Sequence, residues 1–283
     1  MQEGQPSHTA QRVALRRAAH QLLDDPRVFD DPVALRIIGA DSAAALRAAP
    51  ASAAESRLAP YLRASMAVRS RYAEDQLTLA VGRGVGQYVI LGAGLDTFAY
   101  RNPHGAALRV FEVDHPSTQA WKRARLAETA IAIPPQLTFA PVDFERQSLA
   151  EGLRAASFDA SQPAFFAWLG VTPYLSEAAV LQTLRWIAAS PAGSGVVFDY
   201  ALSPALLDAT RRRAFDLLAA HVAAAGEPWQ TFFEPASLRR ELEAMGFGQI
   251  EDLTPDEVNA RYFAGRTDGL RVGALGRLVC AIV

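Results

Sequence analysis

The stretch Tyr88-Val89-Ile90-Leu91-Gly92-Ala93-Gly94-Leu95-Asp96 decides the fold of this 283-residue chain. Its first four residues form an apolar run typical of a buried strand, and the Gly-x-Gly that follows leads into a helical pattern. In doubly wound α/β folds, this turn lets the backbone approach a ligand at the carboxyl end of the first strand. Thr97 stands where a third glycine would complete the dinucleotide fingerprint, which disfavours a pyrophosphate ligand. A purely structural tight turn remains an alternative. If a ligand binds here, the candidate contacts are Gly92, Ala93, Gly94 and Asp96.

Two further predicted strands end in acidic residues. Phe111-Glu112-Val113-Asp114 ends about 20 residues after the glycine turn, where Rossmann-like proteins carry an acid that binds ribose hydroxyls. A carboxylate suits this role because it accepts two charge-assisted hydrogen bonds from a cis-diol. Val142-Asp143-Phe144 adds an acid and an aromatic ring, which suit an adenine amino group and ring face. A surface acid or a helix N-cap before Pro116 is the alternative for Asp114. Three successive strand ends with such chemistry favour a ligand site.

Strand-like runs alternate with helical patterns from residue 87 onward. The expected strands cover residues 88–91, 109–113, 137–142, 164–169, 196–200 and 278–283. The expected helices in this region cover residues 117–131, 177–188, 204–225 and 235–245. Strands at this spacing, separated by helices, predict a parallel sheet with right-handed crossovers.

Residues 1–86 carry helical patterns and almost no strand signal. Asp31 and Pro32 are typical of an N-cap and a first helical position, and Gly39 ends the short helix they begin. A longer helix is predicted over 65–79. We therefore expect one domain, in which a helical extension (1–86) precedes an α/β core (87–283).

The composition disfavours a nucleic-acid partner and a membrane-spanning chain. The net charge is −2, so the chain has no excess of basic residues. The run Arg211–Arg213 lies in a helical pattern and indicates a solvated helix face. No stretch approaches transmembrane length. The only cysteine, Cys280, lies in an apolar run, which predicts a buried thiol and a reducing, cytoplasmic compartment. No metal site is expected, because no metal-ligand spacing links the histidines at positions 8, 20, 104 and 221.

Together, several motifs carry a family resemblance that covers most of the chain. They are Arg69-Ser70-Arg71-Tyr72, Leu91 to Thr97, Phe111 to Pro116, Val142-Asp143-Phe144 and Trp168 to Leu175. In these motifs the sequence resembles the leucine carboxyl methyltransferase-like family, particularly its bacterial branch of S-adenosylmethionine-dependent methyltransferases. The resemblance implies a Rossmann-like class I fold: a mostly parallel seven-stranded sheet, helices on both faces and a helical N-terminal lid. It also implies S-adenosylmethionine as the cofactor.

The resemblance further implies roles for individual residues. Arg71 would clamp the methionine carboxylate, and the Gly92–Gly94 turn would pass under the cofactor. Asp114 would hold the ribose with Glu112 beside it. Asp143 and Phe144 would flank the adenine.

Two residues near these motifs have competing interpretations. Relatives often carry a glutamate after the fourth strand, where this chain reads Ala167-Trp168. Trp168 is therefore a candidate wall of the cofactor pocket, with a core position as the alternative. His115 is a further candidate pocket residue, although its place before Pro116 favours a role at the helix start.

Methyl transfer from a sulfonium needs neither a metal nor a covalent enzyme intermediate, so the sequence assigns no catalytic residue. We expect O-methylation of a carboxyl or hydroxyl group on a small, acidic molecule. The candidate acceptor-binding residues are Arg261, Tyr262 and Arg266, in a late segment that mixes arginines with aromatic residues. Surface ion pairs are the alternative for both arginines.

Two other functions fit parts of the sequence. A non-catalytic protein that binds S-adenosylmethionine would carry the same cofactor motifs. A nicotinamide-dependent oxidoreductase shares the glycine turn and the ribose acid, but the missing third glycine disfavours it.

Overall fold

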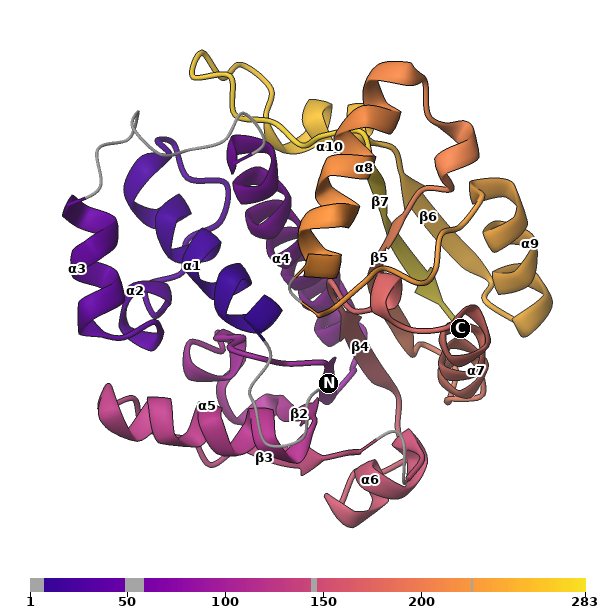
Figure 1. Ribbon diagram of the computed structural model, residues 1–283. Helices are drawn as coiled ribbons and strands as arrows, with labels where there is room; N and C mark the ends of the chain where they lie inside the picture. Colours follow the sequence, from indigo (N-terminus) through magenta and orange to yellow (C-terminus); the bar gives the residue numbers. More distant parts are fainter. Residues whose placement is uncertain (1–7, 49–58, 144–146, 225) are drawn as a thin grey trace.

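A seven-stranded sheet runs through the centre of the molecule in the computed structural model, which describes residues 8–48, 59–143, 147–224 and 226–283 (Figure 1). The strand order is β3-β2-β1-β4-β5-β7-β6. The strands are β1 (Gln87–Leu91), β2 (Arg109–Asp114), β3 (Leu137–Pro141), β4 (Ala164–Trp168), β5 (Gly195–Ala201), β6 (Gln249–Leu253) and β7 (Gly276–Ile282). The first five are parallel, and β7 runs antiparallel to both β5 and β6.

This topology places the candidate ligand residues at one edge of the sheet. After β1 the chain moves outward through β2 and β3, then returns to place β4 on the other side of β1. Leu91, the last residue of β1, is level with Val113 of β2. In open α/β sheets, ligands bind beyond the carboxyl ends of the strands at such a reversal of strand order. The glycine turn after β1 lies at this position.

Helices cover both faces of the sheet because its strands are apolar on both sides. On one face, α4 (Ala59–Gly82) and α10 (Pro255–Tyr262) share a buried apolar cluster with the strands. On the other face lie α6 (Leu149–Ala155), α7 (Glu177–Ala188) and α9 (Pro235–Met245). In α7, the buried residues Val180, Leu184 and Ile187 are spaced four and three apart, so one stripe of the helix faces the sheet.

The N-terminal helices form a third apolar cluster with α5 (Pro116–Glu128). They are α1 (His8–Leu23), α2 (Ala34–Ile37) and α3 (Ala40–Ala48). A buried polar network attaches α1 to α4: Arg63 donates to Asp24 over 2.8 Å, and the His20 ring lies 2.7 Å from the same carboxylate. Figure 1 shows α1 beside α4, between it and α3.

The predicted strands are confirmed to within two residues, and the helices over 177–188 and 235–245 are confirmed at both ends. The helix expected from residue 204 begins instead at Ala209, as α8 (Ala209–Ala224), after a 3-10 turn. The predicted strands do not include β6, an edge strand in which only Ile250 and Leu253 are apolar. No helix in the described part of the chain is long and apolar enough to cross a membrane.

Candidate functional site

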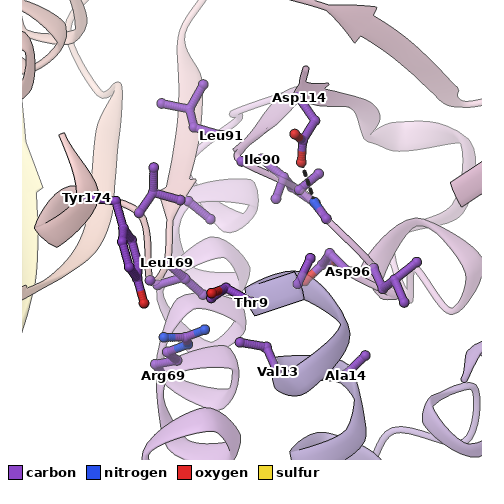
Figure 2. Close-up of a pocket in the computed structure, with 18 of the residues that line it drawn as sticks. Thr9, Val13, Ala14, Arg69, Ile90, Leu91, Asp96, Asp114, Leu169 and Tyr174 are labelled. Carbon is purple, nitrogen blue, oxygen red and sulfur yellow. Dashed lines mark hydrogen bonds between the residues drawn. The ribbon is translucent and has the colours of Figure 1, made fainter. Parts of the chain in front are cut away.

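A cavity of about 370 Å³ opens at the carboxyl edge of β1, β2 and β4; we call it the edge cavity (Figure 2). Its floor is the glycine turn after β1. Its walls come from α1, α4, the segment after β4 and residues 226–230, which precede α9. Four segments far apart in the sequence therefore enclose one volume, and it falls within the usual range for small-molecule sites.

The glycine turn has a backbone that only glycine adopts easily. Gly92 has φ +67° and Gly94 has φ +47°, in the left-handed region. A Cβ on Gly92 would lie 2.5 Å from a Val171 methyl, and one on Gly94 would lie 2.9 Å from the Ala10 Cβ. Both glycines line the cavity, as does Ala93 between them. The turn thus needs glycine for its conformation and also for the close approach of its neighbours.

Asp114 reaches the same turn from the end of β2. Its carboxylate accepts hydrogen bonds from the Gly94 amide over 2.6 Å and from the His115 amide over 2.7 Å (Figure 2). Burial raises the pKa of Asp114, and these two hydrogen bonds oppose the rise. The carboxylate lines the cavity and still has lone pairs to offer a ligand.

Arg69 of α4 supplies a cation to the cavity wall. Its guanidinium packs over Gly170, where a Cβ would lie 2.5 Å from Arg69 Nη1. The same nitrogen is 3.4 Å from the Asp199 carboxylate, and the hydroxyl end of Tyr174 points toward Arg69 in Figure 2. This corner can therefore hold an anionic or hydroxyl group.

Buried charges brace the loop that follows the turn. Arg17 of α1 donates to the Leu95 carbonyl over 2.8 Å and lies 3.4 Å from the Asp96 carboxylate. Asp96 also accepts from the Phe98 amide over 2.8 Å and lines the cavity. These contacts hold the loop and the covering helix together.

Comparisons with known proteins agree with this geometry. The family model described as leucine carboxyl methyltransferase matches residues 10–188, more than half of the chain. The "Putative S-adenosyl-L-methionine-dependent methyltransferase YktD" of Bacillus subtilis is 32% identical over 297 residues, across 95% of each chain. The chain belongs to the leucine carboxyl methyltransferase family.

More distant relatives agree on the family and on the fold. A Mycobacterium avium protein with the same general name is 35% identical over 73% of this chain and 70% of its own length. A crystal structure from Thermobifida fusca, described as a "putative methyltransferase", has a TM-score of 0.57 at 20% identity and covers 99% of this chain and 96% of that one. A DUF574 protein from Streptomyces avermitilis has a TM-score of 0.56 at 18% identity, over 99% and 98%. The expected Rossmann-like class I methyltransferase fold is confirmed.

Arg71, which the family resemblance placed on the methionine carboxylate, lies outside the edge cavity. Its side chain is half exposed and pairs with Asp75 one turn along α4, at 2.8 Å. Residues two apart on a helix point in nearly opposite directions. Arg69, in the same motif, is the arginine that faces the cavity.

Glu112 likewise does not lie beside Asp114 in the cavity. It is fully buried, and its carboxylate accepts from Lys122 of α5 over 2.6 Å. The same ammonium donates to the Asp96 carbonyl over 2.7 Å. Burial raises the pKa of Glu112 to about 7, although Lys122 opposes the rise. The pair braces the glycine loop from behind.

Trp168 lies in the core and His115 lies at a helix start, which are the alternatives to a place in the cofactor pocket. Trp168 is 3% exposed and packs in the apolar cluster under α7, because strand residues alternate sides and its neighbours Ala167 and Leu169 face the cavity. His115 is the N-cap of α5, and its Nδ1 accepts from the Ser117 amide over 3.2 Å. Neither residue lines the edge cavity.

The placement of Asp143 and Phe144 beside the adenine stays a prediction. Asp143 is half-buried and is not among the residues that line the edge cavity. Phe144 lies outside the described residues.

The three predicted acceptor-binding residues are engaged elsewhere. Arg261 pairs with Glu251 at 3.2 Å, Tyr262 donates to Asp75 over 3.0 Å, and Arg266 pairs with Asp268. None lines the edge cavity. Both arginines form the ion pairs that were the alternative, and a role of the three residues in acceptor binding stays a prediction.

The roof of the cavity consists of α1 residues that were not among the predicted contacts. Thr9, Ala10, Val13 and Ala14 of α1 line it, and the Thr9 hydroxyl donates to Glu227 on the opposite rim. The small residues at every third or fourth position of α1 are the only local sign of this close packing. Within the described residues, no group of three or more His, Cys, Asp or Glu side chains is placed to hold a metal ion.

Proposed function

We propose that this S-adenosylmethionine-dependent methyltransferase transfers its methyl group to a hydroxyl or carboxyl oxygen of a small, acidic molecule. The observation that carries the proposal is the polar corner of the edge cavity, where Arg69 and Tyr174 line the wall and Asp199 pairs with Arg69 from outside the cavity. Groups that bind oxygen atoms thus stand next to the cofactor site. The family description, which names a carboxyl acceptor, also supports an oxygen acceptor.

The residues of the edge cavity fit S-adenosylmethionine. Asp114 is a carboxylate with free lone pairs for the ribose diol, and Gly92 and Gly94 leave room for the cofactor above the turn. Arg69 offers its planar fork to the amino-acid carboxylate. When bound, the cofactor supplies an electrophilic methyl group on a positively charged sulfur.

The chain's own contribution is to position the reactants and exclude water. The reaction is an in-line displacement, so holding donor and acceptor at attack distance supplies much of the rate enhancement. Helix α1 and residues 226–230 close over the cavity, and the Thr9–Glu227 hydrogen bond joins them. We propose that the N-terminal helices act as a lid that shields the reacting groups. The buried Cys280, the only cysteine, agrees with a reducing compartment such as the cytoplasm.

The test is transfer of a radiolabelled methyl group from S-adenosylmethionine to a panel of small hydroxy and carboxylic acids. Label in an acceptor supports the proposal; label released by mild alkali identifies a methyl ester, and stable label identifies an ether. Cofactor binding without transfer to any acceptor would favour the non-catalytic alternative. Calorimetry that shows tight NAD binding and no binding of S-adenosylmethionine would favour the oxidoreductase.

A further inference from the structure

A second cavity of about 620 Å³ lies beside the edge cavity; we call it the side cavity. Its walls come from α4, the carboxyl end of β5, α8, the start of α10 and residues 271–278. Figure 1 shows α8 and α10 close together above β5 and β7 at this place. The volume is in the range that encloses a small organic molecule.

The two cavities meet at the Arg69–Asp199 pair. Arg69 lines both of them, whereas Asp199 lines only the side cavity. One Asp199 oxygen accepts from the amide of Gly170, which lines the edge cavity, and the other lies 3.4 Å from Arg69. A group bound in the side cavity against Asp199 is therefore next to the contents of the edge cavity, as direct transfer between two ligands requires.

The charged lining of the side cavity is positive overall. It contains four arginines and two aspartates: Arg69, Arg211, Arg271, Arg277, Asp199 and Asp256. Arg69, Arg211 and Arg277 each pair with a carboxylate. Arg271 is exposed at the mouth, with its guanidinium 3.5 Å from the Tyr61 hydroxyl. In the part of the chain that the structure describes, Arg271 has no carboxylate at ion-pair distance, which leaves it able to bind an anion.

Apolar side chains line much of the side cavity. They include Leu62 and Met66 of α4, Leu218 of α8, and Trp229. A site with this lining suits a ligand with an apolar or aromatic body and a charged group at one end.

We propose that the side cavity binds the methyl acceptor, a small aromatic or apolar hydroxy acid whose carboxylate pairs with Arg271 and whose hydroxyl lies against Asp199. This inference rests on the proposed function and names its acceptor site and substrate class. The acceptor oxygen bonds to the methyl carbon as the carbon–sulfur bond breaks, and the electron pair stays on sulfur. The hydroxyl proton passes to the Asp199 carboxylate. A carboxylate in place of the hydroxyl would be repelled by Asp199, so the product is an ether.

The first test uses two fluorescent probes that differ in one charge. They are 8-anilinonaphthalene-1-sulfonate and its neutral analogue N-phenyl-1-naphthylamine, titrated in the presence of saturating S-adenosylhomocysteine so that only the side cavity is free. We expect the anionic probe to bind at least about fivefold more tightly, and Arg271→Gln to remove this preference. Arg261→Gln removes a comparable exposed arginine outside the cavity and should leave the preference unchanged.

A pair of tryptophan substitutions on α8 tests the location. Ala214 lines the side cavity, whereas Ala220 is exposed on the same helix and does not. Ala214→Trp should weaken both probes about tenfold or more, and Ala220→Trp should change neither. Unchanged binding in Ala214→Trp, or a charge preference that survives Arg271→Gln, would overturn the assignment.

Methyl transfer separates this inference from the proposed function. In Ala214→Trp, we expect normal affinity for S-adenosylhomocysteine and about tenfold or greater loss of acceptor methylation. An alkali-labile product in the wild type, or full methylation by Ala214→Trp, would refute the acceptor site while leaving the O-methyltransferase proposal intact. Absence of oxygen methylation with every acceptor would refute the proposed function itself.

Discussion

The walls of the edge cavity and the side cavity are stabilised in different ways. Behind the edge cavity, Lys122 and Glu112 form an ion pair in which both side chains are 1% exposed, and Arg17 is 5% exposed. Around the side cavity, the Arg211–Asp208 pair is more than half exposed and Arg271 lies at the mouth, although the Arg277–Asp252 pair in its wall is largely buried. Buried pairs fix geometry because neither partner can be released without leaving an uncompensated charge. Exposed pairs exchange with water at little cost.

This difference in exposure fits the binding of the cofactor in the edge cavity and the proposed binding of the acceptor in the side cavity. A cofactor with a constant shape is best bound by a preorganised site whose supporting residues are locked in place. An acceptor site set between helices and a long loop can adjust its walls to its ligand. The contrast can be tested with substitutions in each region. It predicts large changes in stability or ligand affinity behind the edge cavity and small changes on the exposed surface.

The largest effect is expected at the buried pair behind the glycine loop. Lys122→Met leaves Glu112 buried without its partner, which should lower the free energy of unfolding by about 3–5 kcal/mol at pH 8. The pKa of Glu112, about 7 in the folded protein, lies above its unfolded value of about 4.5. The stability linked to this group is therefore fully present below about pH 4.5 and is lost as the pH rises through 7. Without Lys122 that pKa rises further.

Urea unfolding at pH 5.5 and pH 8 measures this difference. We expect the loss in Lys122→Met to be smaller at pH 5.5, where Glu112 can be protonated. The double variant Lys122→Met/Glu112→Leu, which removes both charges, should recover most of the stability. Equal losses at the two pH values would show that the pair does not act as a buried charge pair.

The second prediction compares two glycines with similar backbone conformations. Gly94 has φ +47° and Gly105 has φ +54°, but only Gly94 has a neighbour where a Cβ would be. Replacing either with alanine should cost about 1–2 kcal/mol of stability, from backbone strain. Gly94→Ala should also reduce affinity for S-adenosylhomocysteine by about 100-fold, because the Ala10 contact forces α1 and the turn apart. Calorimetry should give wild-type affinity for Gly105→Ala; an equal loss in both variants would mean that general destabilisation is the cause.

The third prediction concerns Asp114 and pH. Asp114→Asn keeps one oxygen acceptor but loses the charge, so cofactor affinity should fall about tenfold at pH 8. Because burial raises the pKa of Asp114, the wild-type affinity should also fall as the pH is lowered toward that raised value, where the diol-binding carboxylate becomes protonated. Calorimetry at several pH values should give a flatter profile for Asp114→Asn. If the affinity of the wild type changes with pH as little as that of the variant, binding of the ribose does not depend on the Asp114 charge.

The same two regions show what a single sequence can predict. The strands and the glycine turn are local patterns, so the sheet and the cavity positions of Gly92, Gly94, Asp96 and Asp114 followed from short stretches. The missed strand, β6, lies at the sheet edge, where the apolar run that marked the inner strands is absent.

The positions in the structure differ from the predicted ones where side-chain direction or contacts between distant segments decide the outcome. Arg69 and Arg71 stand in one motif, and α4 buries residues on several sides, so its apolar pattern did not show which arginine faces inward. Glu112 is oriented by Lys122, ten residues away on another element. The side cavity is lined by α4, β5, α8, α10 and residues 271–278, whose proximity no local motif records.

The smallest effect is expected at Arg261, which the sequence had favoured as an acceptor residue. It pairs with Glu251 at 3.2 Å, with both side chains more than 40% exposed, and lies 5.7 Å above the Tyr72 ring. Exposed pairs of this kind contribute about 0–1 kcal/mol, so Arg261→Ala should change the free energy of unfolding by less than about 1 kcal/mol. The KM for the best hydroxy acid should stay within about twofold of wild type, whereas Arg271→Gln should raise it about three- to tenfold. Both arginines are exposed and both substitutions remove one positive charge, so a difference in KM reports the position of the arginine. If Arg261→Ala raises KM as much as Arg271→Gln does, the anion is bound on the outer face of α10, and the contrast between the two cavities no longer explains acceptor recognition.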